Sequence, residues 1–289
     1  MSFADRTWRA FDGLELHARD YAAGSGPARL PVICLHGLTR NARDFEDLAP
    51  RLAARGRRVL AVDVRGRGAS AWDPDPLNYQ PATYAQDVIA LAVAAGLARA
   101  QFVGTSMGGI IAMVLASVRP DLVAGAVLND VGPEIAPEGV RRIGGYVGVP
   151  SGAADWSEAA DFARRLNAFA FPAYGPAEWD RFARRIFRED PSGRPVLDYD
   201  PRIAEPVRQA GAAGLAPPLW PLWAALAAGR PVLAVRGAIS DLLSPQTYAR
   251  MLASAPTVAG VEIPGVGHAP ALDEPEALAA IDGFFDANP

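Results

Sequence analysis

The stretch "QFVGTSMGGIIAMVLA", residues 101–116, decides which fold the rest of the sequence must satisfy. An apolar run of strand character leads into glycines around Ser106, and a long apolar helical run follows them. Gly104 to Gly108 fit the pattern G-x-S-x-G, which exposes a nucleophilic serine when it lies between a strand and a helix. The same glycines are compatible with a phosphate-binding loop or with a plain tight turn, so the surrounding sequence has to distinguish three interpretations.

Composition removes several of the competing chemistries. The 289-residue chain has three histidines and one cysteine, and its 28 basic residues are all arginine. Without lysine, a Walker-type phosphate loop and a pyridoxal-phosphate Schiff base are both excluded. HExxH and CxxC motifs are absent, so we expect no histidine- or cysteine-built metal site and no cofactor. A net charge of −4 argues against nucleic acid as a partner.

The sequence also lacks signals for export or for a membrane span. The N-terminal residues carry no charged leader followed by an apolar core, and no apolar run approaches the roughly 20 residues that cross a bilayer. We therefore expect a cytoplasmic protein that does not bind membranes.

Apolar runs of strand length alternate with helical segments through most of the chain. A hairpin is predicted around Asp12 and Gly13, and the continuously apolar strands that follow are typical of a parallel, doubly wound sheet. The alternation stops at about residue 131, where amphipathic helical segments replace it, and it resumes at "RPVLAVRG". We predict a sheet domain made of residues 1–130 and 230–289, interrupted by a helical cap at 131–229.

A nucleophilic serine needs a base, and only one histidine suits that role. His268 lies in the loop after the last predicted strand, whereas His17 and His36 precede Ser106 in the chain. The order serine, acid, histidine that accompanies a G-x-S-x-G turn leaves His268 as the base.

Two aspartates are candidates for the acid that orients His268. Asp241 follows the strand that resumes the sheet, and Asp130 ends the strand before the insertion. We favour Asp241, because its loop places a carboxylate at the end of a strand beside the histidine loop. Asp130 remains the alternative.

The tetrahedral intermediate of acyl transfer also needs hydrogen-bond donors. The segment "LHGLTR" offers a flexible Gly37 followed by the N–H of Leu38, and the N–H of Met107 directly follows the serine. We predict these two N–H groups as the oxyanion hole and His36 as a structural support of the loop.

Five motifs in this order make the chain resemble the α/β-hydrolase superfamily over nearly its whole length: "LHGLTRN", "VDVRGRGAS", "GTSMGG", "GAISD" and "GVGHAP". The resemblance implies a mostly parallel eight-stranded sheet with helices on both faces and an inserted helical cap. A serine in the G-x-S-x-G turn, rather than an aspartate, disfavours the epoxide-hydrolase and haloalkane-dehalogenase branches and favours a serine esterase.

The sequence therefore predicts a hydrolase of small to medium apolar carboxylic esters that works through an acyl-serine intermediate. A lactonase, a perhydrolase or an acyltransferase would use the same residues, and so would a ligand receptor of this fold with little turnover. The sequence leaves the oligomeric state, monomer or homodimer, open. It also leaves open which small-molecule ester is the physiological substrate.

The predicted cap supplies candidates for substrate contact. It holds four of the six tryptophans, and the segment "PLWPLWAALA" leads directly back to the sheet. We predict Trp220 and Trp223 as pocket residues. Arg40, two residues after Leu38, is a candidate partner for a substrate carboxylate.

Overall fold

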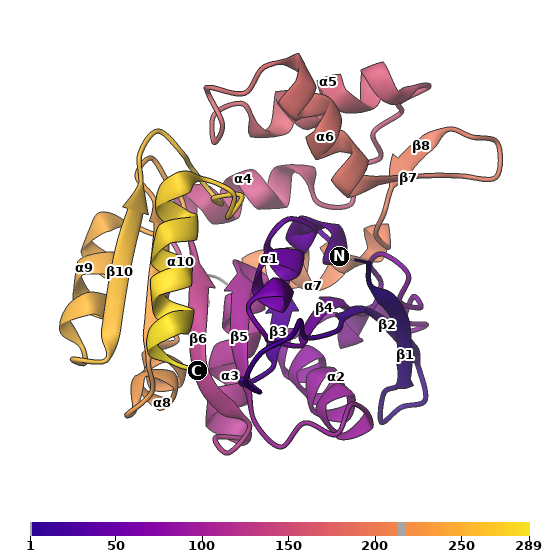
Figure 1. The fold of residues 1–289 in the computed structure, drawn as a ribbon. Coiled ribbons are helices and arrows are strands. Elements are labelled where there is room, and N and C mark those ends of the chain that lie inside the picture. Colours follow the sequence, from indigo (N-terminus) through magenta and orange to yellow (C-terminus); the bar gives the residue numbers. More distant parts are fainter. Residues whose placement is uncertain (1, 213–217) are drawn as a thin grey trace.

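Eight strands form one sheet in the order β1-β2-β4-β3-β5-β6-β9-β10 in the computed structural model, which describes residues 2–212 and 218–289 (Figure 1). The strands are β1 Ala4–Arg9, β2 Glu15–Tyr21, β3 Val32–Leu35, β4 Val59–Asp63, β5 Ala100–Thr105, β6 Val123–Asn129, β9 Val232–Gly237 and β10 Val258–Ile263. The predicted hairpin is confirmed as β1 and β2, which pair antiparallel at one edge. From β4 to β10 all neighbouring strands are parallel.

The central strands are continuously apolar because helices cover both faces of the sheet. In β3, Ile33 and Leu35 face one hydrophobic core, whereas Val32 and Cys34 face the other, and all four side chains are fully buried. Alternate residues of a strand point to opposite faces, so a strand between two helical layers has no position for a polar side chain.

Six helices make up these two layers. They are α1 Leu48–Ala54, α2 Pro81–Ala94, α3 Met107–Val118, α8 Trp220–Ala227, α9 Pro245–Ala253 and α10 Pro275–Ala287. Helices α2, α3, α8 and α9 contribute to the core on one face, and α1 and α10 contribute to the core on the other. Two short 3-10 helices, η1 Ala42–Phe45 and η2 Pro76–Asn78, lie in connections between strands and helices.

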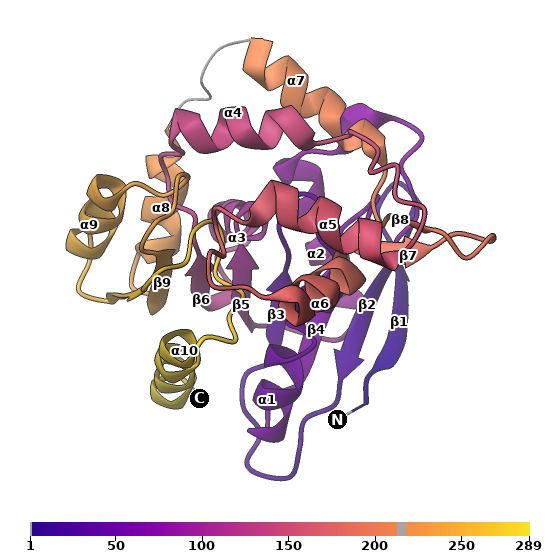
Figure 2. The same ribbon diagram turned by 90° about the horizontal axis from the view of Figure 1, so that it is seen from above.

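The remaining elements lie over one end of the sheet, and we call them the cap. They are α4 Pro137–Tyr146, α5 Trp156–Asn167, α6 Pro176–Ile186, β7 Phe187–Glu189, β8 Pro195–Leu197, η3 Pro201–Ile203 and α7 Ala204–Ala212. Seen from above, α5 and α6 lie across the ends of the central strands (Figure 2). The two helices share a small hydrophobic core of their own, which includes Ala159, Trp179 and Ala183.

The structure differs in two respects from the cap expected at 131–229. The strands β7 and β8 form an antiparallel hairpin that the sequence analysis did not predict. Helix α8, at the end of the expected insertion, packs beside α3 through the buried side chains of Trp223 and Leu226. It therefore belongs to a layer of the sheet domain.

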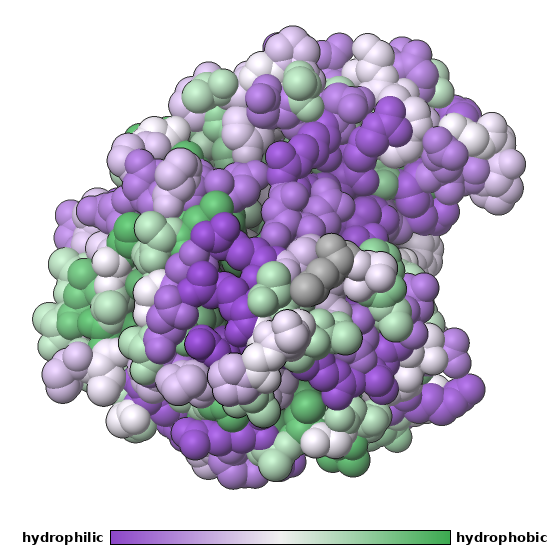
Figure 3. All heavy atoms as spheres, viewed as in Figure 1, coloured by the Kyte–Doolittle hydropathy of each residue, from purple (hydrophilic) through white to green (hydrophobic). Residues whose placement is uncertain are grey.

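The surface of the molecule is mixed in character. Hydrophilic residues cover most of the cap in the face shown in Figure 3, and hydrophobic residues gather in smaller groups around the sheet domain. Among the described residues, no helix combines the length and the apolar character needed to span a bilayer.

Close packing at Gly108 joins α3 to β3 and permits a direct test of the fold. A Cβ at this position would overlap the carbonyl oxygen of Leu35, which is backbone and cannot move aside. We expect Gly108→Ala to lower the free energy of unfolding by about 3 kcal/mol, measured by urea denaturation.

Gly144→Ala is the matched control, because a Cβ there meets no atom within 4 Å. Gly144 is an exposed residue of α4, so alanine should leave stability unchanged or raise it by up to about 1 kcal/mol. Equal effects of the two substitutions would contradict the close contact at Gly108.

Candidate active site

Ser106 occupies a strained turn between β5 and α3. Its backbone angles are φ 52° and ψ −115°, a region that costs a residue with a side chain roughly 1–3 kcal/mol. A Cβ on Gly104 would lie 2.5 Å from the carbonyl carbon of Gly108, so only small residues fit on either side of the serine. The turn lifts the Ser106 side chain above the end of the sheet, as the G-x-S-x-G pattern predicts.

His268 lies within hydrogen-bond distance of this serine, as expected from the chain order. Its Nε2 atom is 3.0 Å from Ser106 Oγ, and its side chain is largely buried. The loop after β10 carries it to the same end of the sheet. The structure therefore brings together two residues that are 162 positions apart in the chain.

The structure pairs His268 with Asp130 and not with Asp241, which the sequence favoured for this contact. His268 Nδ1 lies 2.8 Å from Asp130 Oδ2, and the Asp130 carboxylate is completely buried. Asp130 directly follows β6 and has a φ of 53°, which turns its side chain towards the loop after β9. The N–H of Gly237 donates to Asp130 Oδ1 at 2.8 Å.

Asp241 instead binds the cap. Arg142 of α4 donates to both of its carboxylate oxygens, at 2.6 and 2.9 Å. Burial raises the pKa of Asp241, but the hydrogen bonds and charge of Arg142 outweigh that effect and hold the pKa below its usual value. Asp241 lies in a turn beyond β9, and that turn directs its side chain to α4 rather than to His268.

His36 supports the loop that carries Leu38. The side chain is fully buried, its Nε2 accepts the N–H of Val64 at 3.0 Å, and its Nδ1 lies 2.7 Å from the carbonyl oxygen of Gly37. Because Nε2 is an acceptor, the ring is neutral with its proton on Nδ1. Burial lowers the pKa of His36 to about 4.

The backbone around the serine presents two N–H groups without partners inside the described part of the chain. Neither Leu38 N–H nor Met107 N–H donates a hydrogen bond there. Leu38 lies beside Ser106 in the lining of one cavity, and its carbonyl oxygen accepts from Arg67 Nε at 2.9 Å. Met107 begins α3, so its N–H is one of the unsatisfied donors of a helix N-terminus.

Ser106 and His268 line a cavity of about 270 Å³ between the sheet domain and the cap. The cap contributes mainly aromatic and aliphatic side chains, among them Ile143, Phe162, Leu166, Phe171, Phe182 and Tyr199. Such a lining suits an apolar substrate placed by a few polar groups.

The two tryptophans expected in this cavity lie elsewhere. Trp220 donates a hydrogen bond to Glu134, and the Arg250 guanidinium stacks over its ring at 3.8 Å. Trp223 is buried and donates to Ser254 Oγ at 2.9 Å. Both predictions are wrong because α8 packs along a face of the sheet, away from the strand ends that carry Ser106.

Arg40, by contrast, lines the cavity. It donates to Asp44 through Nε, at 2.9 and 3.0 Å to the two carboxylate oxygens, and its guanidinium lies 4.2 Å from the Phe182 ring centre. It therefore connects the loop after β3 to α6 of the cap.

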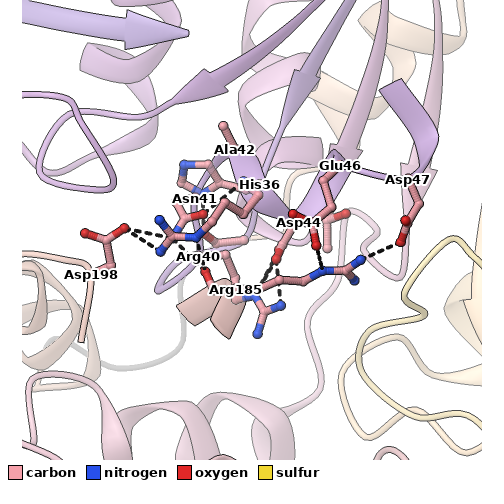
Figure 4. A network of polar contacts seen from close by, with 12 residues as sticks. His36, Arg40, Asn41, Ala42, Asp44, Glu46, Asp47, Arg185 and Asp198 are labelled. Atoms are coloured by element: carbon pink, nitrogen blue, oxygen red, sulfur yellow. Dashed lines mark hydrogen bonds and ion pairs between the residues drawn. The ribbon is translucent and has the colours of Figure 1, made fainter. Parts of the chain in front are cut away.

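A wider set of ion pairs joins α6 to the same loop. Arg185 donates to Glu46 at 2.8 Å and to Asp47 at 2.5 Å, and Arg181 also pairs with Asp47. Figure 4 shows Arg185 reaching Glu46 and Asp47 beside the segment that carries His36 and Arg40. Charged side chains at this end of the cavity thus neutralise one another.

The low pKa of His36 predicts how stability depends on pH. The unfolded chain binds a proton at His36 below a pH of about 6.5, but the folded protein does not until about pH 4. Stability from this residue is therefore present above pH 6.5 and is lost as pH falls, by about 1.4 kcal/mol per pH unit.

His36→Gln, whose side-chain oxygen can still accept the N–H of Val64, removes the titrating group. We expect the fall in unfolding free energy between pH 6.5 and pH 5 to be shallower in the variant, as measured by urea denaturation at each pH. All other titrating residues are common to the wild type and the variant. Equal falls in unfolding free energy with pH in the two proteins would therefore show that His36 does not resist protonation in the folded state.

Comparisons with known proteins show the family of the chain. The alpha/beta hydrolase family model matches residues 32–281. A 3-hydroxybutyrate-oligomer hydrolase of Cupriavidus necator is 37% identical over 275 residues, which are 93% of each chain. A 2-(acetamidomethylene)succinate hydrolase of Mesorhizobium japonicum is 32% identical over 267 residues, 91% of this chain and 90% of that protein.

A solved structure shows the same architecture. The crystal structure of an alpha/beta hydrolase from Novosphingobium aromaticivorans has a TM-score of 0.92 and 48% identity, and the match covers 99% of both chains. With the eight-stranded sheet and the strained serine turn, these matches show that the chain belongs to the alpha/beta hydrolase family.

Proposed function

We propose that this hydrolase cleaves carboxylic esters, with Ser106 as the nucleophile, His268 as the general base and Asp130 as the acid that orients it. The continuous chain of hydrogen bonds from Asp130 through His268 to Ser106 carries the proposal. It ends in a cavity large enough for a small ester. A serine hydroxyl is a weak nucleophile until a base in such a position removes its proton.

The reaction follows from the positions of these groups. Ser106 Oγ attacks the ester carbonyl while His268 Nε2 takes its proton, and the N–H groups of Leu38 and Met107 stabilise the oxyanion. His268 then protonates the departing alcohol. Asp130 accepts the Nδ1–H throughout, which holds the tautomer and balances the charge of the imidazolium. Water activated by His268 finally attacks the acyl-serine and releases the acid.

The cavity and the relatives together favour a short substrate. A volume of about 270 Å³ lies at the lower end of small-molecule sites. The Cupriavidus relative is named for hydrolysis of 3-hydroxybutyrate oligomers and aligns over nearly all of both chains. We therefore propose short linear esters of hydroxy acids as substrates. Arg40, whose Nε and Nη2 bind Asp44 and whose Nη1 makes no hydrogen bond within the described residues, is the proposed contact for a terminal carboxylate.

Replacement of the nucleophile tests the proposal. We expect wild-type protein to hydrolyse p-nitrophenyl butyrate and the linear dimer of 3-hydroxybutyrate. Ser106→Ala should lower kcat on both by more than about 10⁴-fold, because the acyl-serine can no longer form. The unfolding midpoint of the variant serves as control and should not fall. A rate within tenfold of wild type would rule out Ser106 as the nucleophile.

A comparison of two aspartate variants tests the assignment of the acid. Asp130→Asn should lower kcat on p-nitrophenyl butyrate by about 10⁴-fold, because an amide cannot hold the productive tautomer of His268. Asp241→Asn should cost less than about tenfold, since it removes only a partly exposed contact with Arg142. The reverse order would restore Asp241 as the acid.

A further inference from the structure

Ser240, in the loop between β9 and α9, has a hydroxyl group that makes three hydrogen bonds. Ser240 Oγ accepts the N–H groups of Leu242 and Leu243, both at 3.1 Å, and lies 2.5 Å from Asp130 Oδ2. A hydroxyl has one proton and two lone pairs. With both lone pairs occupied, the proton of Ser240 has a single direction left, towards Asp130.

Ser240 and His268 bind the same carboxylate oxygen. Asp130 Oδ2 accepts from His268 Nδ1 at 2.8 Å and from Ser240 Oγ, while Oδ1 accepts the N–H of Gly237 at 2.8 Å. Three donors, from the end of β9, the loop after it and the loop after β10, therefore fix the Asp130 carboxylate. A buried carboxylate needs such donors, since an unsatisfied charged group in the interior costs several kcal/mol.

We infer that Ser240 is a positioning residue of the active site: its hydroxyl fixes the Asp130 carboxylate in the plane in which it holds His268 against Ser106. The inference rests on the proposed ester hydrolysis. It gives a role to the residue before Asp241, in the same "GAISD" motif from which Asp241 was expected to act as the acid.

The position of Ser240 is in turn fixed by the cap. The N–H of Gly139 donates to the Asp241 carbonyl at 3.1 Å, and the N–H of Ala136 donates to the Leu242 carbonyl at 2.9 Å. The side chain of Asp241 points away from Asp130, to Arg142 of α4. The loop therefore contacts the cap through Asp241 and Leu242, and the Asp130 carboxylate through Ser240, the residue before them.

Removal of the hydroxyl should affect chemistry more than substrate binding. We expect Ser240→Ala to lower kcat on p-nitrophenyl butyrate by about tenfold or more, with KM within about twofold, because hydrogen bonds to charged groups are the strong ones. Ser240→Thr keeps the hydroxyl and should restore most of the rate. Ser240→Cys, a weak donor of similar size, should fall between threonine and alanine.

A second readout is independent of substrate binding. The rate at which a small fluorophosphonate labels Ser106 measures how well His268 activates it, and Ser240→Ala should slow this rate by the same factor as kcat. Ser244→Ala is the matched control. Ser244 caps α9 by accepting the N–H of Thr247, so its loss should lower the unfolding midpoint but leave labelling unchanged.

A double-mutant cycle shows whether Ser240 acts through Asp130. If it does, Ser240→Ala should slow labelling by less than about twofold in an Asp130→Asn background, since the partner is already lost. Full additivity of the two effects would overturn the inference, and so would wild-type kcat and labelling in Ser240→Ala. If Ser240→Ala does not fold, threonine and cysteine variants of equal activity would overturn it.

These outcomes are distinct from a failure of the proposed function. If wild-type protein neither hydrolyses the ester nor reacts with the fluorophosphonate, ester hydrolysis at Ser106 itself is wrong, and the role of Ser240 falls with it. If wild-type protein does both and only Ser240→Ala is without effect, ester hydrolysis stands and the positioning role alone is wrong.

Discussion

The position of the Asp130 carboxylate depends on the pairing of two parallel strands. Asn129 of β6 lies opposite Val235 of β9, and the N–H of Asp130 donates to the Val235 carbonyl at 2.8 Å. This places Asp130 beside the point where β9 ends at Gly237. The positive φ of Asp130 then turns its side chain across the end of β9, where the Gly237 N–H and the Ser240 hydroxyl meet it. His268, and through it Ser106, is aligned from that point.

Much of this arrangement could be predicted from the sequence because it follows from burial. The strands around Ser106 are continuously apolar, since two helical layers cover them, and two of them, β5 and β6, are followed by residues with positive φ, Ser106 and Asp130. The glycines on either side of Ser106 indicate that neighbouring backbone leaves no room for a side chain at these positions. His268 is the one histidine that follows the serine in the chain. Pattern and chain order were sufficient to predict two residues whose side chains lie 3.0 Å apart in the structure, Ser106 and His268.

The acid is harder to predict from the sequence, because nothing in the residues around Asp130 indicates its positive φ. Asp130 and Asp241 both follow parallel strands whose carboxyl ends lie at the same end of the sheet. What separates them is the φ of 53° at Asp130 and the presence of Arg142 opposite Asp241. A signal did exist in the chain: Asp130 directly follows its strand, whereas Asp241 lies several residues beyond the end of β9.

The tryptophans were misplaced for a topological reason. A helix that leads into a parallel strand runs along the face of the sheet, so α8 must pack there whatever its aromatic content. Most of the aromatic residues of the cavity instead come from the cap, and Phe162, Phe171 and Phe182 of α5, α6 and the segment between them are among its lining. To predict pocket residues from a sequence of this kind, amphipathic helices that do not pack on the sheet are therefore a better choice than a helix that leads directly into a strand.

The cap is attached to the sheet domain in two physically different ways. Helix α4 is joined by backbone hydrogen bonds and by the pair of Arg142 and Asp241, next to Ser240. Helix α6 is joined mainly through side chains. Arg181 pairs with Asp47 at the surface, whereas the largely buried Arg185 pairs with both Glu46 and Asp47. Exposed pairs of this kind contribute only about 0–1 kcal/mol each and weaken with salt. The attachment of α6 therefore depends on Arg185, whose carbonyl oxygen also accepts from Asn41 Nδ2 at 2.9 Å, whereas α4 is held by backbone hydrogen bonds to the residues that follow Ser240.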